Sequence, residues 1–165
     1  MIKDFVVFDD YVEYSGPFEL RELYILIDKY FKDRHYDKNE KKHFEKNSEE
    51  GRLIELLMVP NKTVSEYIKM NIEILIEIKN IQDITINVND KKKTIQQGDV
   101  SIRFRSFILK DYAGSWEKPW LMFLRSLIDK YIYKTHIGQF GDELIEDTER
   151  LKFQIKSFLN LHNRR

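Results

Sequence analysis

The chain contains no cysteine. This absence excludes a disulfide framework, a thiolate metal site and a thiol nucleophile. Small secreted domains usually depend on disulfides, so we expect a protein of the reducing cytoplasm. The N-terminal segment also lacks the uninterrupted apolar stretch of a signal peptide, because Asp4, Asp9 and Asp10 interrupt it. The sequence therefore predicts a cytoplasmic location.

An excess of charge of either sign is absent as well. Lysine plus arginine residues number 28, aspartate plus glutamate residues also number 28, and the formal net charge is +0. No overall field therefore draws the protein towards nucleic acid or anionic lipid. We expect no general nucleic-acid binding, although a local charged patch is compatible with these numbers.

Short catalytic and ligand-binding motifs are also lacking. The sequence has no G-x-x-x-x-G-K-[ST], G-x-G-x-x-G, H-E-x-x-H or G-x-S-x-G segment. His35 and His43 have a spacing that places them together on neither a helix nor a strand. An acidic group near predicted strand ends comprises Asp9, Asp10, Glu13 and Asp111. Such a group fits a hard cation or acid–base chemistry, but carboxylates in this position are usually solvated. We therefore predict no metal and no cofactor, favour a non-enzymatic role, and assign no catalytic residue.

The residues that are present indicate a folded protein. Apolar residues make up 42% of the chain and aromatic residues 13%, more than a highly charged disordered chain would contain. At 165 residues, the chain is long enough to bury a core of its own. No repeat, low-complexity linker or change of composition marks a boundary. We predict a single domain spanning residues 1–165.

The first third of the chain predicts a strand and then a helix. The N-terminal segment is rich in Val, Phe and Tyr, which favours a strand that ends before Pro17, with a bulge near Asp9. Pro17 suits the first turn of a helix that extends to about residue 34. The apolar stripe of that helix comprises Leu20, Leu23, Tyr24, Ile27, Tyr30 and Phe31. Residues 35–50 carry charges of both signs and are expected to form a solvated connection, with one helical turn at most.

The middle of the chain predicts an antiparallel meander. Residues 52–59 end at Pro60, and a second strand follows after a turn. In this second strand, the even-numbered positions from Val64 to Ile78 place seven apolar side chains in eight positions on one side. Asn89 and Asp90 suit a tight hairpin, and Gly98 allows an irregular link into the last strand.

The C-terminal third changes to a helical period from about residue 117. The segment GQFG at 138–141 predicts a break, and a second helix is expected over residues 142–161. The predicted fold class is therefore α+β, with an N-terminal strand and helix followed by a curved antiparallel sheet that two C-terminal helices cover.

The stretch from Gly114 to Gly141 is unusually apolar and holds both tryptophans. It does not span a membrane, because Arg125, Asp129 and two lysines lie within it. Its wide apolar arc predicts packing against the sheet and the final helix. The order of elements is also compatible with a helix-grip arrangement, in which a curved sheet wraps the last helix around an apolar pocket.

The candidate contact residues are Lys69, Arg103, Arg105, Trp116 and Trp120. The two arginines share one side of a strand, and with the lysine they form a basic strip that could meet a phosphate or a carboxylate. The alternative is cross-strand pairing of these cations with Glu73 or Glu77. The tryptophans provide an aromatic rim, and Trp, Tyr and Arg most often carry binding energy.

Two functions fit these residues. The first is a cytoplasmic, non-enzymatic interaction module with a protein partner. The second is a binder of an apolar small molecule or lipid, held in a pocket between the sheet and the C-terminal helix. A filled core favours the first and an internal cavity the second, and the sequence leaves the oligomeric state open.

Overall fold

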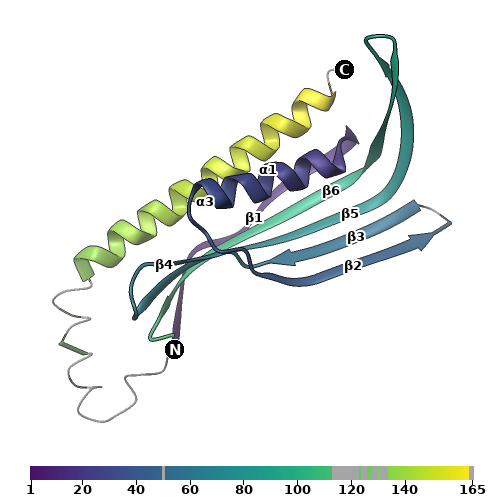
Figure 1. Cartoon of the computed structure of the whole chain (residues 1–165). Helices are drawn as coiled ribbons and strands as arrows, with labels where there is room; N and C mark the ends of the chain where they lie inside the picture. The colour runs from purple at the N-terminus through teal and green to yellow at the C-terminus, as the bar shows by residue number, and fades with distance from the viewer. Residues whose placement is uncertain (50, 113–122, 124–125, 128–129, 131–133, 164–165) are drawn as a thin grey trace.

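The computed structural model describes residues 1–49, 51–112, 123, 126–127, 130 and 134–163 (Figure 1). The elements along the chain are β1 (Ile2–Phe18), α1 (Leu20–Asp33), β2 (Glu40–Ser48), β3 (Gly51–Met58), β4 (Asn61–Thr63), β5 (Ile68–Val88), β6 (Lys91–Lys110) and α3 (Lys134–Asn163). The strands form an antiparallel open sheet in the order β1-β6-β5-β3-β2, with the short β4 paired to β5. The predicted α+β fold is confirmed.

One face of the sheet forms the core. The even-numbered side chains from Ile68 to Ile78 in β5 are 0% exposed, as their alternation predicts. The residues of α3 that face them are Leu144, Leu151, Ile155 and Leu159. Between these layers the Ser106 and Thr148 hydroxyls are 2.6 Å apart in a buried hydrogen bond, which fixes α3 on this face.

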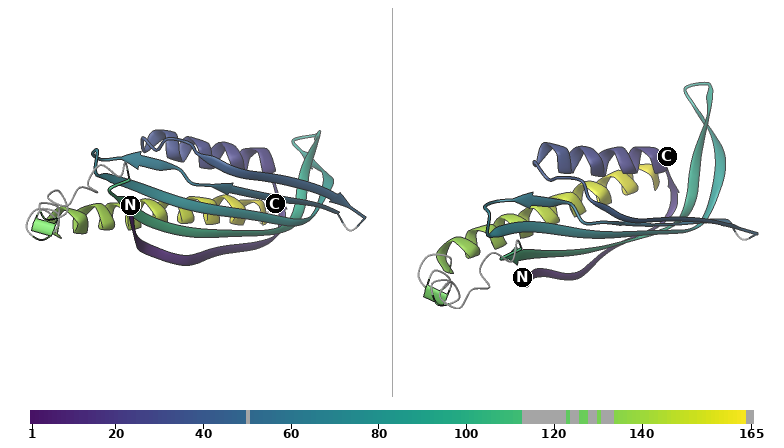
Figure 2. Two further views of the ribbon diagram at one scale, coloured as in Figure 1. Left: turned by 90° about the horizontal axis from the view of Figure 1, so that it is seen from below. Right: turned by 60° about the horizontal axis from the view of Figure 1, so that its bottom comes forward.

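The opposite face of the sheet, called the uncovered face below, carries no helix among the described residues. The two views in Figure 2 show α1 and α3 on the same side of the sheet, so within the described chain no helix lies over the other face. Because side chains alternate along a strand, the residues between the buried ones of β5 and β6 project from this uncovered face. Most of these residues are polar, as contact with solvent favours, whereas Leu75, Phe107 and Leu109 add apolar side chains to this face.

Beyond the sheet, β5 and β6 continue as a two-stranded arm that curves towards the helices (Figure 1). The arm turns at Asn89 and Asp90, whose φ angles of 50° and 61° confirm the predicted tight hairpin. At its base, a Cβ atom on Gly98 would lie 2.8 Å from the Lys79 carbonyl oxygen, so this crossing admits only glycine. The arm also contacts the start of α1, where the Leu20 amide donates to Gln96 Oε1 at 3.1 Å.

The helix α1 begins later than expected. Pro17 lies in β1, opposite Gln97 of β6, and not in the first helical turn. An edge strand tolerates proline because the missing N–H can belong to its unpaired side. The predicted apolar stripe is correct, and its buried members are Leu23, Ile27, Tyr30 and Phe31.

Residues 40–48 form the edge strand β2, so the prediction of a solvated connection was wrong for them. Among the described strands its one neighbour is β3, and the side chains described for it, residues 40–47, are all exposed. It therefore shows no apolar alternation in the sequence. Its charges are typical of edge strands, which need protection from pairing with other chains.

The predicted break at residues 138–141 is also wrong. The helix α3 continues through Gly138 and Gly141, because a helical glycine costs about 1 kcal/mol and packing can outweigh that cost. The helix expected from residue 117 lies almost wholly outside the described residues. No helix in the described part of the chain is long and apolar enough to cross a membrane.

Candidate functional site

The uncovered face carries two of the predicted contact residues side by side. Phe104 and Ser106 of β6 point to the core, so Arg103 and Arg105 project from the other side of the strand, as predicted. Arg105 Nη1 is 3.7 Å and Arg103 Nη2 is 3.8 Å from Glu73 Oε1 of β5. The cross-strand pairing considered as the alternative is therefore present for Glu73.

A second carboxylate reaches these arginines from β1. Arg105 Nε donates a hydrogen bond of 2.6 Å to Asp9 Oδ1, and Arg103 Nε is 3.8 Å from the same atom. The hydrogen bond from Arg105 lowers the pKa of Asp9 and raises that of Arg105. We call the group of Asp9, Glu73, Arg103 and Arg105 the arginine cluster; its formal charges sum to zero.

Asp9 occupies the bulge that the sequence predicted. The pairing of β1 with β6 shifts between Val7 and Asp10, and Asp9 has a φ of 30°. Positive φ is costly for a residue with a Cβ atom and persists where the surroundings enforce it. The bulge turns the Asp9 carboxylate towards Arg105, a partner that sequence alternation alone did not reveal.

Exposed aromatic side chains adjoin the arginine cluster on β1. Phe8 is 70% exposed and stacks on Phe5 at 5.3 Å between ring centres. Phe5 in turn lies 5.4 Å from Phe107 of β6. Tyr11 is 48% exposed and pairs in register with Arg103. Sequence analysis did not single out these aromatic residues, because the alternation of β1 is interrupted at the bulge.

The remaining predicted contact residues lie apart from this group. Lys69 is four positions before Glu73 in β5, and its Nζ lies 4.4 Å from the centre of the Tyr112 ring. It does not join the arginine cluster. Trp116 and Trp120 lie outside the described residues.

A second polar group lies between the two helices. Asp147 of α3 is only 2% exposed; its Oδ1 is 3.0 Å from Arg34 Nη1, and its Oδ2 accepts a 3.0 Å hydrogen bond from the Tyr36 hydroxyl. The Tyr30 hydroxyl donates to the Asp147 carbonyl oxygen at 2.5 Å. The sequence carries one sign of this group. Asp147 follows Leu144 by three residues and precedes Leu151 by four, so helical spacing places its side chain on the buried stripe of α3.

Burial shifts the ionisation of this group. Loss of solvent raises the pKa of the Asp147 carboxyl, although Tyr36 and Arg34 oppose the shift. Burial and the neighbouring Asp147 also raise the pKa of Tyr30 to about 12, and that of Tyr36 further. Both tyrosines are therefore neutral hydrogen-bond donors at physiological pH.

Two clefts flank this helix junction. One, of about 530 Å³, is lined by residues including Phe31, His35, Tyr36 and Met58. The other, of about 510 Å³, lies between α1 and α3 and is lined by residues including Tyr30, Arg34 and Arg150. Neither cleft includes residues of the buried β5 row, so neither is the pocket between sheet and C-terminal helix that a helix-grip arrangement would have.

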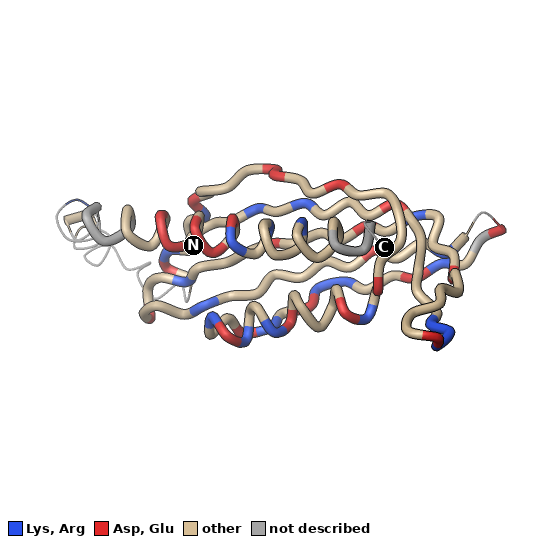
Figure 3. The backbone as a smooth tube through the Cα atoms, turned by 90° about the horizontal axis from the view of Figure 1, so that it is seen from above, with Lys and Arg blue, Asp and Glu red and all other residues tan. Residues whose placement is uncertain are grey.

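Residues of both charges alternate along the described part of the backbone. Figure 3 shows basic and acidic residues interspersed along the helices and strands. Within the described residues, no group of three or more His, Asp or Glu side chains is arranged to hold a metal ion. His43, for example, lies 3.7 Å from Glu40 on the exposed edge strand.

The sequence matches no protein-family model and no curated protein.

Proposed function

We propose that this protein is a non-enzymatic interaction module that binds a protein partner through the uncovered face of its sheet. The exposed aromatic side chains of β1 beside the arginine cluster carry this proposal. Phe8 and Tyr11 offer apolar area at low entropic cost, and Arg103 and Arg105 offer directional donors. Interface hot spots are enriched in Tyr, Trp and Arg. The lack of cysteine supports a cytoplasmic location for the module.

The arginine cluster suits a protein surface better than a polyanion. Each guanidinium already lies near Asp9 and Glu73, so a phosphate backbone would meet two carboxylates together with two cations. A protein partner can instead supply both hydrogen-bond acceptors and apolar groups. Such preformed charge pairs mainly select the partner and the register of binding.

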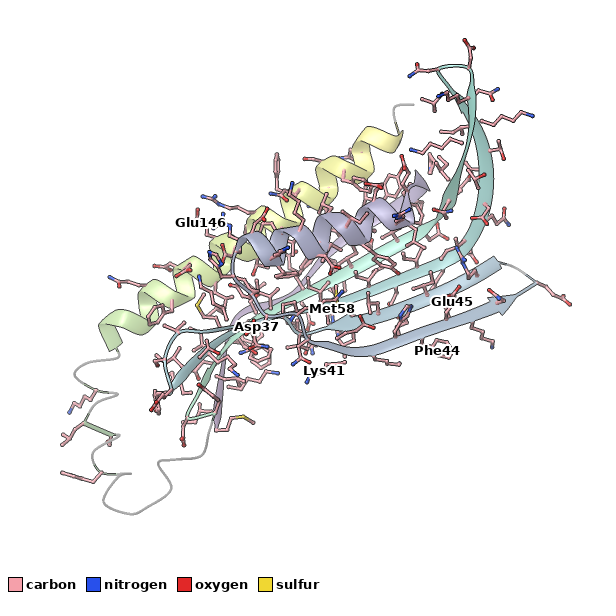
Figure 4. The ribbon with its side chains drawn as sticks, viewed as in Figure 1. Asp37, Lys41, Phe44, Glu45, Met58 and Glu146 are labelled. Carbon is pink, nitrogen blue, oxygen red and sulfur yellow. The ribbon has the colours of Figure 1, made fainter. Side chains whose placement is uncertain are left out.

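The edges of the sheet are poor sites for a partner strand. At one edge, the bulge at Asp9 interrupts the regular spacing of β1. At the other edge, β2 exposes several lysines and glutamates, among which Phe44 projects away from the helices (Figure 4). Both features hinder strand addition, so they favour contact through the face of the sheet.

The alternative function, binding of an apolar small molecule or lipid between sheet and C-terminal helix, has less support. The side chains of Leu144, Leu151 and Ile155 are 0% exposed against the sheet, and the two clefts at the helix junction lie elsewhere. A ligand in that layer would need to displace packed side chains.

Photocrosslinking tests the proposed surface. A photoreactive phenylalanine analogue placed at Tyr11 should join the protein to a specific partner in its own cells. The same analogue at Phe153, which is 71% exposed on α3, is the matched control. We expect the adduct from position 11 only, and its loss when Phe8→Ser is added, because that change removes exposed apolar contact without a large cost in stability.

Two results would contradict the proposal. One is the same adduct from positions 11 and 153, which would show no preference for the sheet face. The other is an adduct from position 11 that persists with Phe8→Ser in a protein whose circular dichroism matches the parent.

A further inference from the structure

The groove between α1 and α3 collects basic side chains from both helices. We call the cleft of about 510 Å³ lined by Lys29, Tyr30, Asp33, Arg34, Arg150 and Gln154, together with Leu26, the basic groove. Lys29 and Arg34 come from α1 and the residue that follows it, and Arg150 comes from α3, whereas Asp33 is the one carboxylate among these lining residues. Residues 26, 29, 30 and 33 recur at helical spacing, so they share the side of α1 that borders the groove.

Each arginine of the basic groove is paired with a carboxylate of α3, Arg34 with the buried Asp147 and Arg150 with the exposed Glu146. Arg34 Nη1 lies 3.0 Å from the buried Asp147 Oδ1, and the Arg34 guanidinium carbon is 5.9 Å from the centre of the Tyr30 ring. Arg150 pairs through Nη2 with Glu146, which projects from α3 away from the sheet (Figure 4). A carboxylate that orients a binding side chain lowers the entropic cost of using it.

Each guanidinium keeps donors for a further ligand. Arginine carries five N–H groups, and the pairing with its carboxylate engages one nitrogen of each side chain. Arg34 remains 36% exposed and Arg150 remains 55% exposed. Lys29 is exposed beside them on α1 and adds a mobile ammonium group.

From this arrangement we infer that the basic groove binds the phosphoryl group of a small, free phosphorylated compound. Two guanidinium forks match the tetrahedral oxygens of a phosphate, and the lysine adds a third positive charge. Three carboxylates lie near these three cations: Asp33 in the lining, Asp147 paired with Arg34, and Glu146 paired with Arg150. Unlike the arginine cluster, the groove holds most of these carboxylates outside its lining, of which Asp33 is the one acidic member. An extended polyanion would also contact the carboxylates beyond the groove, whereas a compact dianion contacts the lining residues alone. This site is independent of the sheet face proposed for the protein partner.

Calorimetric titration with inorganic phosphate and with pyrophosphate, at constant ionic strength, tests the inference. We expect saturable binding to the full chain. Arg150→Gln and Lys29→Gln should each weaken it by about tenfold or more, because each removes a charged donor. Arg21→Gln is the matched control, since it alters an exposed arginine of α1 that does not line the groove. Its affinity should equal that of the parent. Arg150 and Lys29 are exposed, and circular dichroism verifies that their variants fold.

Vesicles distinguish the source of the phosphoryl group. Vesicles of phosphatidylcholine with phosphatidic acid present the same phosphomonoester on a lipid headgroup. If the soluble anions bind, we expect that the protein does not cosediment with these vesicles. Absence of saturable binding of both soluble anions would overturn the inference. Equal affinity of the parent and Arg150→Gln would also overturn it, as would binding to the vesicles alone.

Discussion

At the scale of single residues, Asp147 decides how α1 meets α3. Its carboxylate pairs with Arg34 and accepts a hydrogen bond from Tyr36, and its backbone carbonyl accepts one from Tyr30. One residue of α3 therefore binds three side chains from the end of α1 and the segment that follows it. A buried polar group is stabilising only while its partners are present, and it is costly when one is removed.

Substitution of Asp147 tests this role. Asp147→Ala should lower the free energy of unfolding by about 1–3 kcal/mol, because it leaves the Tyr36 hydroxyl buried without its acceptor. Asp147→Asn should cost less, since its side-chain oxygen can still accept from Tyr36. The neighbouring Glu146→Ala is the control and should stay within about 0.5 kcal/mol, as is usual for exposed sites. Urea unfolding measures all three. Equal stability of Asp147→Ala and Glu146→Ala would show that the helix contact does not depend on the carboxylate.

At the scale of elements, the long helix α3 carries two glycines where the sequence predicts a break. A Cβ atom added to Gly138 would meet open space, with no heavy atom within 4 Å. At Gly141 the nearest atom to such a Cβ is Val6 Cγ1 at 3.6 Å, which is ordinary contact. Neither glycine is required by its surroundings, so the helix tolerates them at the expense of backbone entropy.

Gly138→Ala should therefore stabilise the protein by about 0.5–1 kcal/mol, because alanine has the higher helix propensity. The contrasting variant is Gly51→Ala at the start of β3. There φ is 133° and a Cβ atom would lie 3.0 Å from the Asn80 carbonyl carbon, so we expect a clear loss of stability. Thermal unfolding of both variants measures the difference. A loss of stability in Gly138→Ala would contradict a continuous helix through this position.

At the scale of the whole molecule, buried tyrosines link stability to alkaline pH. Burial raises the pKa of Tyr24 and of Tyr30 to about 12, and it raises that of Tyr36 as well. The unfolded chain loses these protons near pH 10, whereas the folded chain retains them. The folded state therefore binds more protons in this range. The associated stability is fully present below about pH 10 and is lost as the pH rises through the folded values.

We expect the free energy of unfolding to fall between about pH 10 and pH 12, by at most about 1.4 kcal/mol per pH unit for each tyrosine. Tyr36→Phe should be less stable than the parent at neutral pH but should show a shallower decline, because one linked proton is gone. Urea unfolding at each pH measures this decline. The tyrosinate absorbance of the folded protein should rise at a higher pH than that of the unfolded chain. A urea midpoint that is constant up to pH 12 would contradict the linkage.

Several elements were predictable because their signals are local. The buried row of β5 follows from strict alternation, the hairpin from Asn89 and Asp90, and the core stripe of α1 from helical spacing. The position of Arg103 and Arg105 on one side of β6 follows from the same alternation. In each case the decisive interaction lies within a few residues along the chain.

Other features were decided only by tertiary structure. The charged segment 40–48 is a strand because β3 provides its partner, and Pro17 belongs to β1 because β6 lies beside it. Asp9 reaches Arg105 across a sequence distance of 96 residues, and Tyr36 reaches Asp147 across 111. Composition and periodicity determine which side chains a strand or helix buries, since that choice depends on near neighbours. They do not determine which distant carboxylate meets which cation, because that pairing exists only after the sheet and both helices have packed.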